Sequence, residues 1–257
     1  MFFSILASGS KGNSFFLSTD RVKLLIDAGL SCKELERRLI LTGIHPEDLD
    51  AIIITHEHSD HTKGAGPMAR RFGLPLYLND GTYKSGKKKF GKLPQPIILE
   101  TGQSIEIGDV LVETITKCHD AADPIGLVLS NNNIRVGLAT DLGRTTRLLE
   151  DRLRGCHVLV LEFNHDPDML KDGPYPLYLK RRIMGNDGHL SNLQAGMLLD
   201  TIATKDLKHL ILAHLSETNN NPKKAYTQAV EVMKKKGLNN SRILIGAQHE
   251  PSPLIKI

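Results

Sequence analysis

Three histidines and an aspartate are crowded into one short segment in the first quarter of the chain. Residues 55–61 read THEHSDH, and the apolar residues AIII come directly before them. If the apolar stretch is a strand, His56 and His58 project to the same side of the extended backbone, whereas Asp60 and His61 follow the turn. Imidazole and carboxylate groups at this density are typical of metal ligands. The segment therefore predicts a metal site at the end of a strand.

Further donors with the same placement occur later in the chain. His119, Asp141 and His214 each follow an apolar or alternating stretch that predicts a strand. Taken singly, each of these residues is typical of a structural polar position. Together with residues 55–61, their order resembles the metallo-β-lactamase superfamily, whose H-x-H-x-D-H signature is followed by a lone histidine, an aspartate and a final histidine. The resemblance covers nearly the whole chain.

The resemblance implies a dinuclear metal site with seven ligands. One ion would be bound by His56, His58 and His119, the other by Asp60, His61 and His214, and Asp141 would bridge them. Two cations lower the pKa of a water molecule between them, so that hydroxide is available near neutral pH to attack a phosphoryl group. The mixed donors suit zinc, manganese or iron and do not choose among them.

The same resemblance implies roles for two aspartates, Asp60 and Asp27. Asp60 is expected to serve catalysis as well as metal binding. Asp27 follows the strand-like run LLI and matches a family position that supports the ligand histidines from behind. A turn residue at a strand end is an equal alternative for Asp27.

The order of the expected elements predicts an α/β fold. Strands are expected at 2–7, 14–17, 22–26, 74–78, 158–161, 210–212 and 243–245, with mainly strands over 97–138, and helices at 31–42, 66–72, 145–153, 191–202 and 222–236, with helical material up to about 184. Ser31 is the expected N-cap of the first helix. Two β-rich halves with helices outside indicate a four-layer αβ/βα sandwich. Residues 1–257 are expected to form a single metallo-β-lactamase-fold domain, because the gap between Asp141 and His214 is too short for a β-CASP insertion.

Composition narrows the class of protein. With 40% hydrophobic and 24% charged residues the chain resembles an ordinary globular protein, and its net charge of +4 permits a polyanionic partner without requiring one. The three cysteines lack a C-x-x-C spacing, which argues against a disulfide framework or a cysteine zinc site. No apolar run approaches a membrane span and no signal peptide is recognised, so membrane contact and secretion are not expected.

Two residues between Asp141 and His214 favour phosphodiester chemistry. Glu162 ends an apolar strand-like run, and His189 precedes a helix in the segment GHLSN. Both resemble ribonuclease Z, in which such a pair transfers a proton to the leaving oxygen, and an alkoxide leaving group needs that proton. The alternative for His189 is an exposed residue at a helix start. The segment FNH after Glu162 and the lack of a Gly/Pro-rich arm differ from ribonuclease Z and argue against tRNA processing.

Several segments resemble the smaller WalJ/YycJ/VicX-type proteins of this superfamily. They lie at 6–14, 26–31, 55–61, 118–121, 162–166, 180–183, 188–192 and 214–222. This resemblance implies a cytoplasmic bacterial nuclease with 5′-to-3′ exonuclease activity on double-stranded DNA. An RNA-processing or small-molecule phosphodiesterase, a thioester hydrolase of the same fold and a non-catalytic metal protein remain open. The oligomeric state is not predicted.

Candidate substrate contacts lie in two places. The first is the loop with Ser8, Ser10 and Asn13, whose backbone N–H groups suit a phosphate, although a plain turn is an equal alternative. The second is the run Lys180-Arg181-Arg182, which lies close before His189 and is expected to contact the DNA backbone. A further lysine-rich stretch at 84–92 is expected to be a solvated face.

Overall fold

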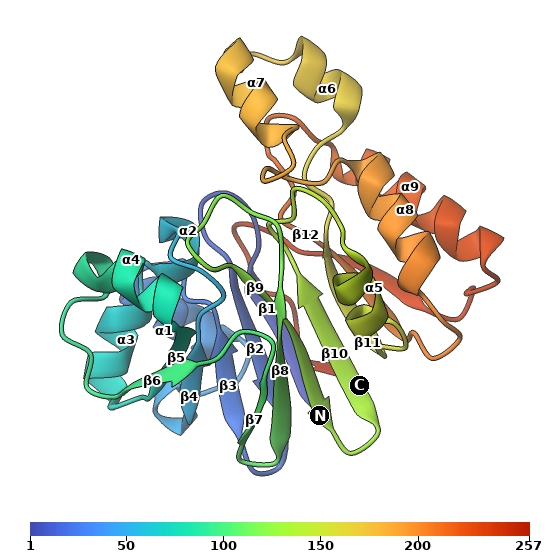
Figure 1. Ribbon diagram of the computed structural model, residues 1–257. Helices are drawn as coiled ribbons and strands as arrows, with labels where there is room; N and C mark the ends of the chain where they lie inside the picture. Colours follow the sequence, from blue (N-terminus) through green and yellow to red (C-terminus); the bar gives the residue numbers. More distant parts are fainter. The chain divides into compact units, whose positions relative to one another are not determined.

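The computed structural model describes residues 1–257 as two compact units. Unit 1 comprises Met1–Thr114, Ala121–Ile125 and Ala247–Ile257, and unit 2 comprises Ile115–Asp120 and Gly126–Gly246. The strands belong to two mixed sheets accompanied by helices, which places the chain in the α/β class (Figure 1). The organisation of these units as a single domain stays a prediction. No helix is long and apolar enough to cross a membrane.

Unit 1 is built on a seven-stranded sheet in the order β14-β1-β2-β3-β4-β5-β6. Its strands are β1 (Phe2–Ala7), β2 (Ser14–Ser18), β3 (Lys23–Ile26), β4 (Ala51–Ile53), β5 (Leu76–Asn79), β6 (Pro96–Leu99) and β14 (Ile255–Lys256). The pairs from β14 to β3 are antiparallel, and those from β3 to β6 are parallel. In addition, β7 (Ser104–Ile107) pairs antiparallel with β8 (Val110–Thr116).

The helices of unit 1 cover its parallel strands. They are α1 (Cys32–Leu41), α2 (Ser59–Thr62), α3 (Ala65–Phe72) and α4 (Asp80–Phe90), with a 3₁₀ turn η1 (Pro46–Asp48). Figure 1 shows α1, α3 and α4 gathered beside β5 and β6. Leu35, Met68 and Phe90 from these helices pack in one buried cluster with Leu25 and Ile52 of the sheet. Burial of these apolar helix faces is the main force that fixes the helices on the sheet.

Most expected elements of unit 1 are present within a few residues of their predicted ends. Ser31 caps α1 as predicted, and its hydroxyl oxygen accepts a hydrogen bond from the N–H of Glu34 at 3.3 Å. The sequence did not predict α4, because Gly81 and Gly86 lie inside it and an interior glycine costs roughly 1 kcal/mol in a helix. Gly86 is required there, since a Cβ atom would come within 2.4 Å of the Phe90 ring.

Unit 2 is built on strands of which the last four are parallel and have their C-terminal ends at one edge. They are β9 (Ile125–Asn131), β10 (Ile134–Ala139), β11 (Val158–Glu162), β12 (His209–Ala213) and β13 (Arg242–Ile245). Strand β9 pairs antiparallel with β10, and β10 to β13 are parallel. The apolar runs 158–161 and 210–212, predicted as strands, are fully buried in the structure. Both faces of such parallel strands are covered, which explains their unbroken apolar sequence.

The helices of unit 2 are α5 (Arg147–Leu153), α6 (Pro167–Asp172), α7 (Leu177–Ile183), α8 (Asn192–Ile202) and α9 (Pro222–Lys235). Leu149, Leu199 and Val232 from α5, α8 and α9 pack with Leu161 and Leu212 in a single buried cluster. The helical material expected up to residue 184 forms two short helices, α6 and α7, which stand away from the sheet of this unit (Figure 1). Helix α7 has no buried residue.

Candidate metal centre and acid–base pair

The metal-ligand segment of unit 1 follows two parallel strands that end at the same edge. Ile26 of β3 is paired with Ile53 of β4. Asp27 follows β3 directly, and residues 55–61 follow β4. The carboxyl ends of neighbouring parallel strands meet, so the side chain of Asp27 lies next to the histidine segment.

Asp27 fixes the orientation of this segment. Its Oδ1 accepts a hydrogen bond from the N–H of Thr55 at 2.8 Å, and its Oδ2 accepts one from the Thr55 hydroxyl at 2.9 Å. The same Oδ2 lies 2.7 Å from Nδ1 of His61. A carboxylate on one ring nitrogen orients the ring and leaves Nε2 for a metal ion. Asp27 is therefore a supporting residue in this geometry. Its φ of 55° is the left-handed conformation, which a non-glycine residue adopts rarely.

Asp60 and His61 lie on the short helix α2, which is held tightly against the loop after β3. Gly29 is required at this contact, since a Cβ atom there would come within 1.7 Å of the carbonyl oxygen of Asp60. The amide of Asn13 reaches both side chains, with Nδ2 at 3.2 Å from Asp60 Oδ2 and 3.1 Å from His61 Nε2. Of the three proposed contacts of the phosphate loop, Ser8 and Asn13 are buried and Ser10 is exposed.

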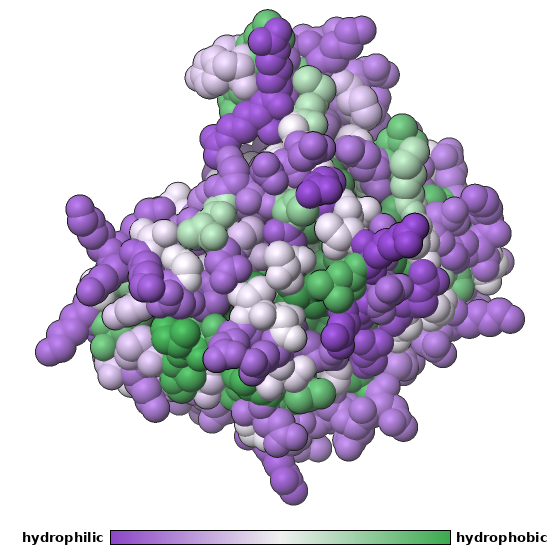
Figure 2. Space-filling view, viewed as in Figure 1, coloured by the Kyte–Doolittle hydropathy of each residue, from purple (hydrophilic) through white to green (hydrophobic).

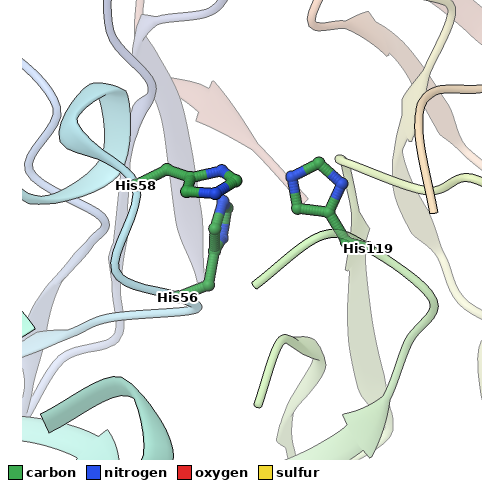
Figure 3. Close-up of side chains that lie close together, drawn as sticks. All are labelled: His56, His58 and His119. Atoms are coloured by element: carbon green, nitrogen blue, oxygen red, sulfur yellow. The ribbon is translucent and has the colours of Figure 1, made fainter. Parts of the chain in front are cut away.

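His56 and His58 lie side by side in unit 1, with ring centroids 4.8 Å apart and an edge-to-face arrangement (Figure 3). His56 and His58 thus project to the same side of the backbone, as expected from the sequence. The Thr55 hydroxyl lies 3.0 Å from Nδ1 of His56, and His56 is fully buried. His119, also labelled in Figure 3, belongs to unit 2 and follows β8.

In unit 2, three candidate residues stand at the ends of three adjacent parallel strands. Asp141 follows β10, Glu162 is the last residue of β11, and His214 follows β12. Asp141 and His214 have φ values of 56° and 54°. Left-handed backbone at non-glycine residues costs free energy and concentrates at functional sites. Four non-glycine residues of the chain have positive φ, and three of them are Asp27, Asp141 and His214.

Asp141 faces two of the predicted histidine ligands within unit 2. Its Oδ1 lies 3.4 Å from Nε2 of His214 and 3.9 Å from Nε2 of His119. The opposite ring nitrogens face other groups. Nδ1 of His119 lies 3.2 Å from the carbonyl oxygen of Gly188, and Nδ1 of His214 lies 3.2 Å from Glu162 Oε1. Both rings thus present Nε2 toward one shared carboxylate, the arrangement expected around a bridging ligand.

The buried carboxylate of Glu162 connects the segments that carry the other candidate residues. Its Oε2 accepts hydrogen bonds from the N–H groups of Leu142 at 2.9 Å and Leu190 at 3.0 Å, and its Oε1 lies 2.8 Å from Nδ1 of His189. Burial alone would raise the pKa of Glu162, but the nearby rings of His189 and His214 outweigh it and lower the pKa to about 2. Glu162 is therefore ionised near neutral pH.

His189 is held by this carboxylate and is not a freely exposed residue at a helix start. Its side chain is 21% exposed, and its Nδ1 also lies 3.9 Å from Asp141 Oδ1. Asp141, Glu162, His189 and His214 form one cluster of potential ligand atoms.

Burial lowers the pKa of His119 to about 4, although the carboxylate of Asp141 acts in the opposite direction. A neutral imidazole is the form that binds a metal ion.

Asn164 and His165 were not predicted as site residues. Nδ2 of Asn164 donates to the carbonyl oxygen of His214 at 3.0 Å and lies 3.2 Å from its Nδ1. His165 is buried, and burial lowers its pKa to about 4. The signal in the sequence is their place within three residues of Glu162, in the segment 162–166 that carries the family resemblance. An amide is not a typical member of a histidine and carboxylate ligand set, so Asn164 did not stand out.

The three proposed DNA contacts of α7 differ in their surroundings. Nζ of Lys180 donates to the carbonyl oxygen of Lys171 at 2.6 Å. The guanidinium of Arg182 makes two contacts with the carboxylate of Asp120, at 2.6 Å from Nε and 2.5 Å from an Nη atom. Arg181 is exposed and has no ion-pair partner. Arg182 therefore ties α7 to the residue that follows His119.

Comparisons with known proteins place most of the chain in the same superfamily. Residues 23–215 match the family model of a beta-lactamase superfamily domain. The chain is 40% identical to exodeoxyribonuclease YycJ of Bacillus anthracis over 91% of this chain and 90% of that protein. It is also 40% identical to exodeoxyribonuclease WalJ of Streptococcus pneumoniae over 85% of this chain and 82% of that protein.

A solved structure supports the same assignment at the level of the fold. The metallo-β-lactamase-fold protein YhfI of Bacillus subtilis aligns over 98% of both chains with a TM-score of 0.75 and 17% identity. The predicted fold class is thereby confirmed. The clustered histidine and aspartate groups suit divalent metal ions. The chain therefore belongs to the beta-lactamase superfamily and is a hydrolase of the metallo-β-lactamase fold.

Proposed function

We propose that this protein is a metal-dependent exodeoxyribonuclease that degrades double-stranded DNA in the 5′-to-3′ direction in the cytoplasm. The observation that carries the proposal is the contact of 2.8 Å between Glu162 and His189, next to Asp141. A phosphodiester has an alkoxide leaving group that needs a proton, and this pair is suited to deliver one. Relatives named exodeoxyribonucleases, similar along most of the chain, support the choice of DNA.

The proposed metal site has seven ligands and holds two divalent cations, which we take to be zinc, manganese or iron. Its proposed ligands are those that the family resemblance implies, namely His56, His58, Asp60, His61, His119, Asp141 and His214. The donor set fits such ions, because imidazole and carboxylate groups predominate and the Nδ1 atoms of His56, His61, His119 and His214 all face protein groups. Bound cations supply a nucleophile from water at neutral pH and neutralise charge on the phosphoryl oxygens.

His189 is the proposed proton donor. Its Nδ1 faces the ionised Glu162, which leaves Nε2 as the ring nitrogen directed to substrate. Glu162 stabilises the positively charged imidazolium before the transfer. When the P–O bond breaks, the proton passes from His189 to the departing alkoxide, and Glu162 keeps the ring in place through its three further contacts.

The proposal is tested with duplex DNA labelled at one 5′ or 3′ end, in the presence of Mn²⁺ or Zn²⁺. We expect release of short labelled products from the 5′-labelled strand and progressive shortening of the 3′-labelled strand. Bis-p-nitrophenyl phosphate and a thioester serve as substrates for the alternative activities. Hydrolysis of the thioester without cleavage of DNA would overturn the proposal, and cleavage of RNA in preference to duplex DNA would redirect it.

Of the three basic residues of α7, Arg181 is the one that we propose contacts the DNA backbone, because Lys180 and Arg182 are held by protein groups. Because Arg182 is paired with Asp120, Arg181→Ala is expected to weaken binding of duplex DNA with little change in sequence preference. Loss of one phosphate contact flattens the log–log salt dependence of binding by roughly 0.9. Titrations at several salt concentrations measure this slope. If Arg181→Ala has the slope of the parent protein, Arg181 is only a solvated residue and makes no phosphate contact.

A further inference from the structure

We infer that the exposed lysine face of α4 is a binding surface for the phosphate backbone of duplex DNA, next to the metal-ligand segment of unit 1. The inference rests on the proposed nuclease function and adds a second DNA contact to it. It concerns Lys87, Lys88 and Lys92, which the comparisons with known proteins do not assign to any role. Lys87 and Lys88 lie on α4 and Lys92 lies just after its C-cap, and we call these three residues the α4 lysine face.

Helix α4 lies directly against the segment that carries His56 and His58. Nζ of Lys89 donates a hydrogen bond at 2.9 Å to the carbonyl oxygen of Glu57, the residue between the two histidines. The carboxylate of Glu57 in turn accepts from the N–H of Ala122 at 2.9 Å. One end of this lysine-rich helix is therefore attached to the ligand segment. Phosphates held by α4 would be held beside that segment.

The helix is fixed at both ends, so its exposed face has a defined orientation. At the N-terminus, Oδ1 of Asn79 accepts from the N–H of Thr82 at 2.9 Å, while Nδ2 of Asn79 donates to the carbonyl oxygen of Asp123 at 2.6 Å. At the C-terminus, the guanidinium of Arg70 donates to the carbonyl oxygen of Phe90 at 2.7 Å. Phe90 itself is fully buried. These contacts make α4 a rigid support for charged side chains.

The charges on the exposed side of α4 are not neutralised by neighbouring acids. Lys84 forms an ion pair with Asp80 at 2.6 Å. Lys87, Lys88 and Lys92 are exposed and have no carboxylate within ion-pair distance. Lys84, Lys87 and Lys88 share one face, because they are three and four residues apart. Figure 2 shows hydrophilic side chains projecting over the position of α4.

Stabilisation of the helix is the competing explanation for these lysines. Cations in the last turn interact favourably with the helix dipole, by typically 0.3–1 kcal/mol each. Lys87 and Lys88 lie in that turn, but Lys92 lies beyond the C-cap Gly91 and gains less from it. A polyanion accounts for all three, because repeated unpaired cations on a rigid surface match the regular phosphates of a duplex.

The experiment compares two variants of equal charge change. In the first, Lys87, Lys88 and Lys92 are replaced together by Gln, which is a good helix former. In the control, Gln replaces Lys205, Lys223 and Lys234, three exposed lysines of unit 2 that also lack an ion-pair partner. Binding of the metal-loaded proteins to a blunt duplex with phosphorothioate ends is measured at several salt concentrations. The modified ends slow cleavage during the titration.

We expect the salt slope of the α4 variant to fall by about 2.7, since each lost phosphate contact removes roughly 0.9. Between about 50 and 200 mM salt, the parent should then lose roughly 40-fold more affinity than the variant. The control should keep the parental slope, and all three proteins should hydrolyse bis-p-nitrophenyl phosphate equally. A parental slope in the α4 variant, an equal loss in the control, or a lowered melting temperature without a change in DNA binding overturns the inference.

The outcomes separate this inference from the proposed function. If the parent binds the duplex through the α4 lysine face but does not degrade an unmodified duplex, the nuclease proposal fails and the DNA-binding surface stands. If the parent degrades duplex DNA and the α4 variant binds like the parent, the nuclease proposal stands and the surface is rejected. A parent that does not bind the duplex at all overturns the inference.

Discussion

Asp141→Ala is expected to release the bound metal and abolish phosphodiester hydrolysis. Oδ1 of Asp141 faces Nε2 of both His119 and His214, so loss of the carboxylate affects both proposed ions. Substitutions behind the ligands typically cost 10–100-fold in metal affinity or activity, and loss of a bridging ligand should exceed about 100-fold. Metal content per chain after dialysis and the rate on bis-p-nitrophenyl phosphate measure the effect.

Two further variants show whether the effect belongs to the carboxylate. Asn tolerates the left-handed backbone at this position, so Asp141→Asn removes the charge with little added strain. It should lose metal like the Ala variant. Asp151→Ala changes an exposed aspartate of α5 and should leave metal content and rate unchanged. Full metal content in Asp141→Asn would contradict a bridging role for this residue.

The order and type of most elements were predictable because their apolar patterns are strong. The unbroken apolar runs 158–161 and 210–212 predict strands, and the structure shows them as the buried, parallel strands β11 and β12. Placement of polar residues at strand ends was also predictable, since Asp141, Glu162 and His214 come directly after or at the end of these strands. The family resemblance, not the pattern, supplied the division of the ligands between two ions.

Contacts between segments far apart in sequence were not predictable. Nothing in the run 180–182 indicates that Arg182 is paired with Asp120, because partners that distant carry no local signal. Helix α4 was missed because its interior glycines lower helix propensity, while the packing of Gly86 against Phe90 compensates for it. A lysine-rich stretch without an apolar stripe reads as solvated, and its attachment to Glu57 appears only in three dimensions.

The second large effect is expected from His189→Ala, which should keep the metal but slow departure of the leaving group. General acid catalysis typically contributes roughly 10²–10⁴-fold, so kcat on DNA should fall by that factor. A p-nitrophenyl ester should lose much less, because p-nitrophenolate leaves without a proton. Single-turnover rates on both substrates, together with metal content, measure the difference.

Glu162→Gln tests whether the carboxylate acts through His189. The pKa of Glu162 is lowered to about 2 by His189 and His214 in spite of burial, so the native residue offers a negative charge that Gln lacks. Gln keeps an oxygen to accept from the N–H groups of Leu142 and Leu190, which protects the local fold. We expect the same pattern as in His189→Ala, with a large loss on DNA and a small one on the activated ester. Equal losses on both substrates in the two variants would reject proton donation and leave the pair a structural role, since poor packing or metal loss slows both reactions alike.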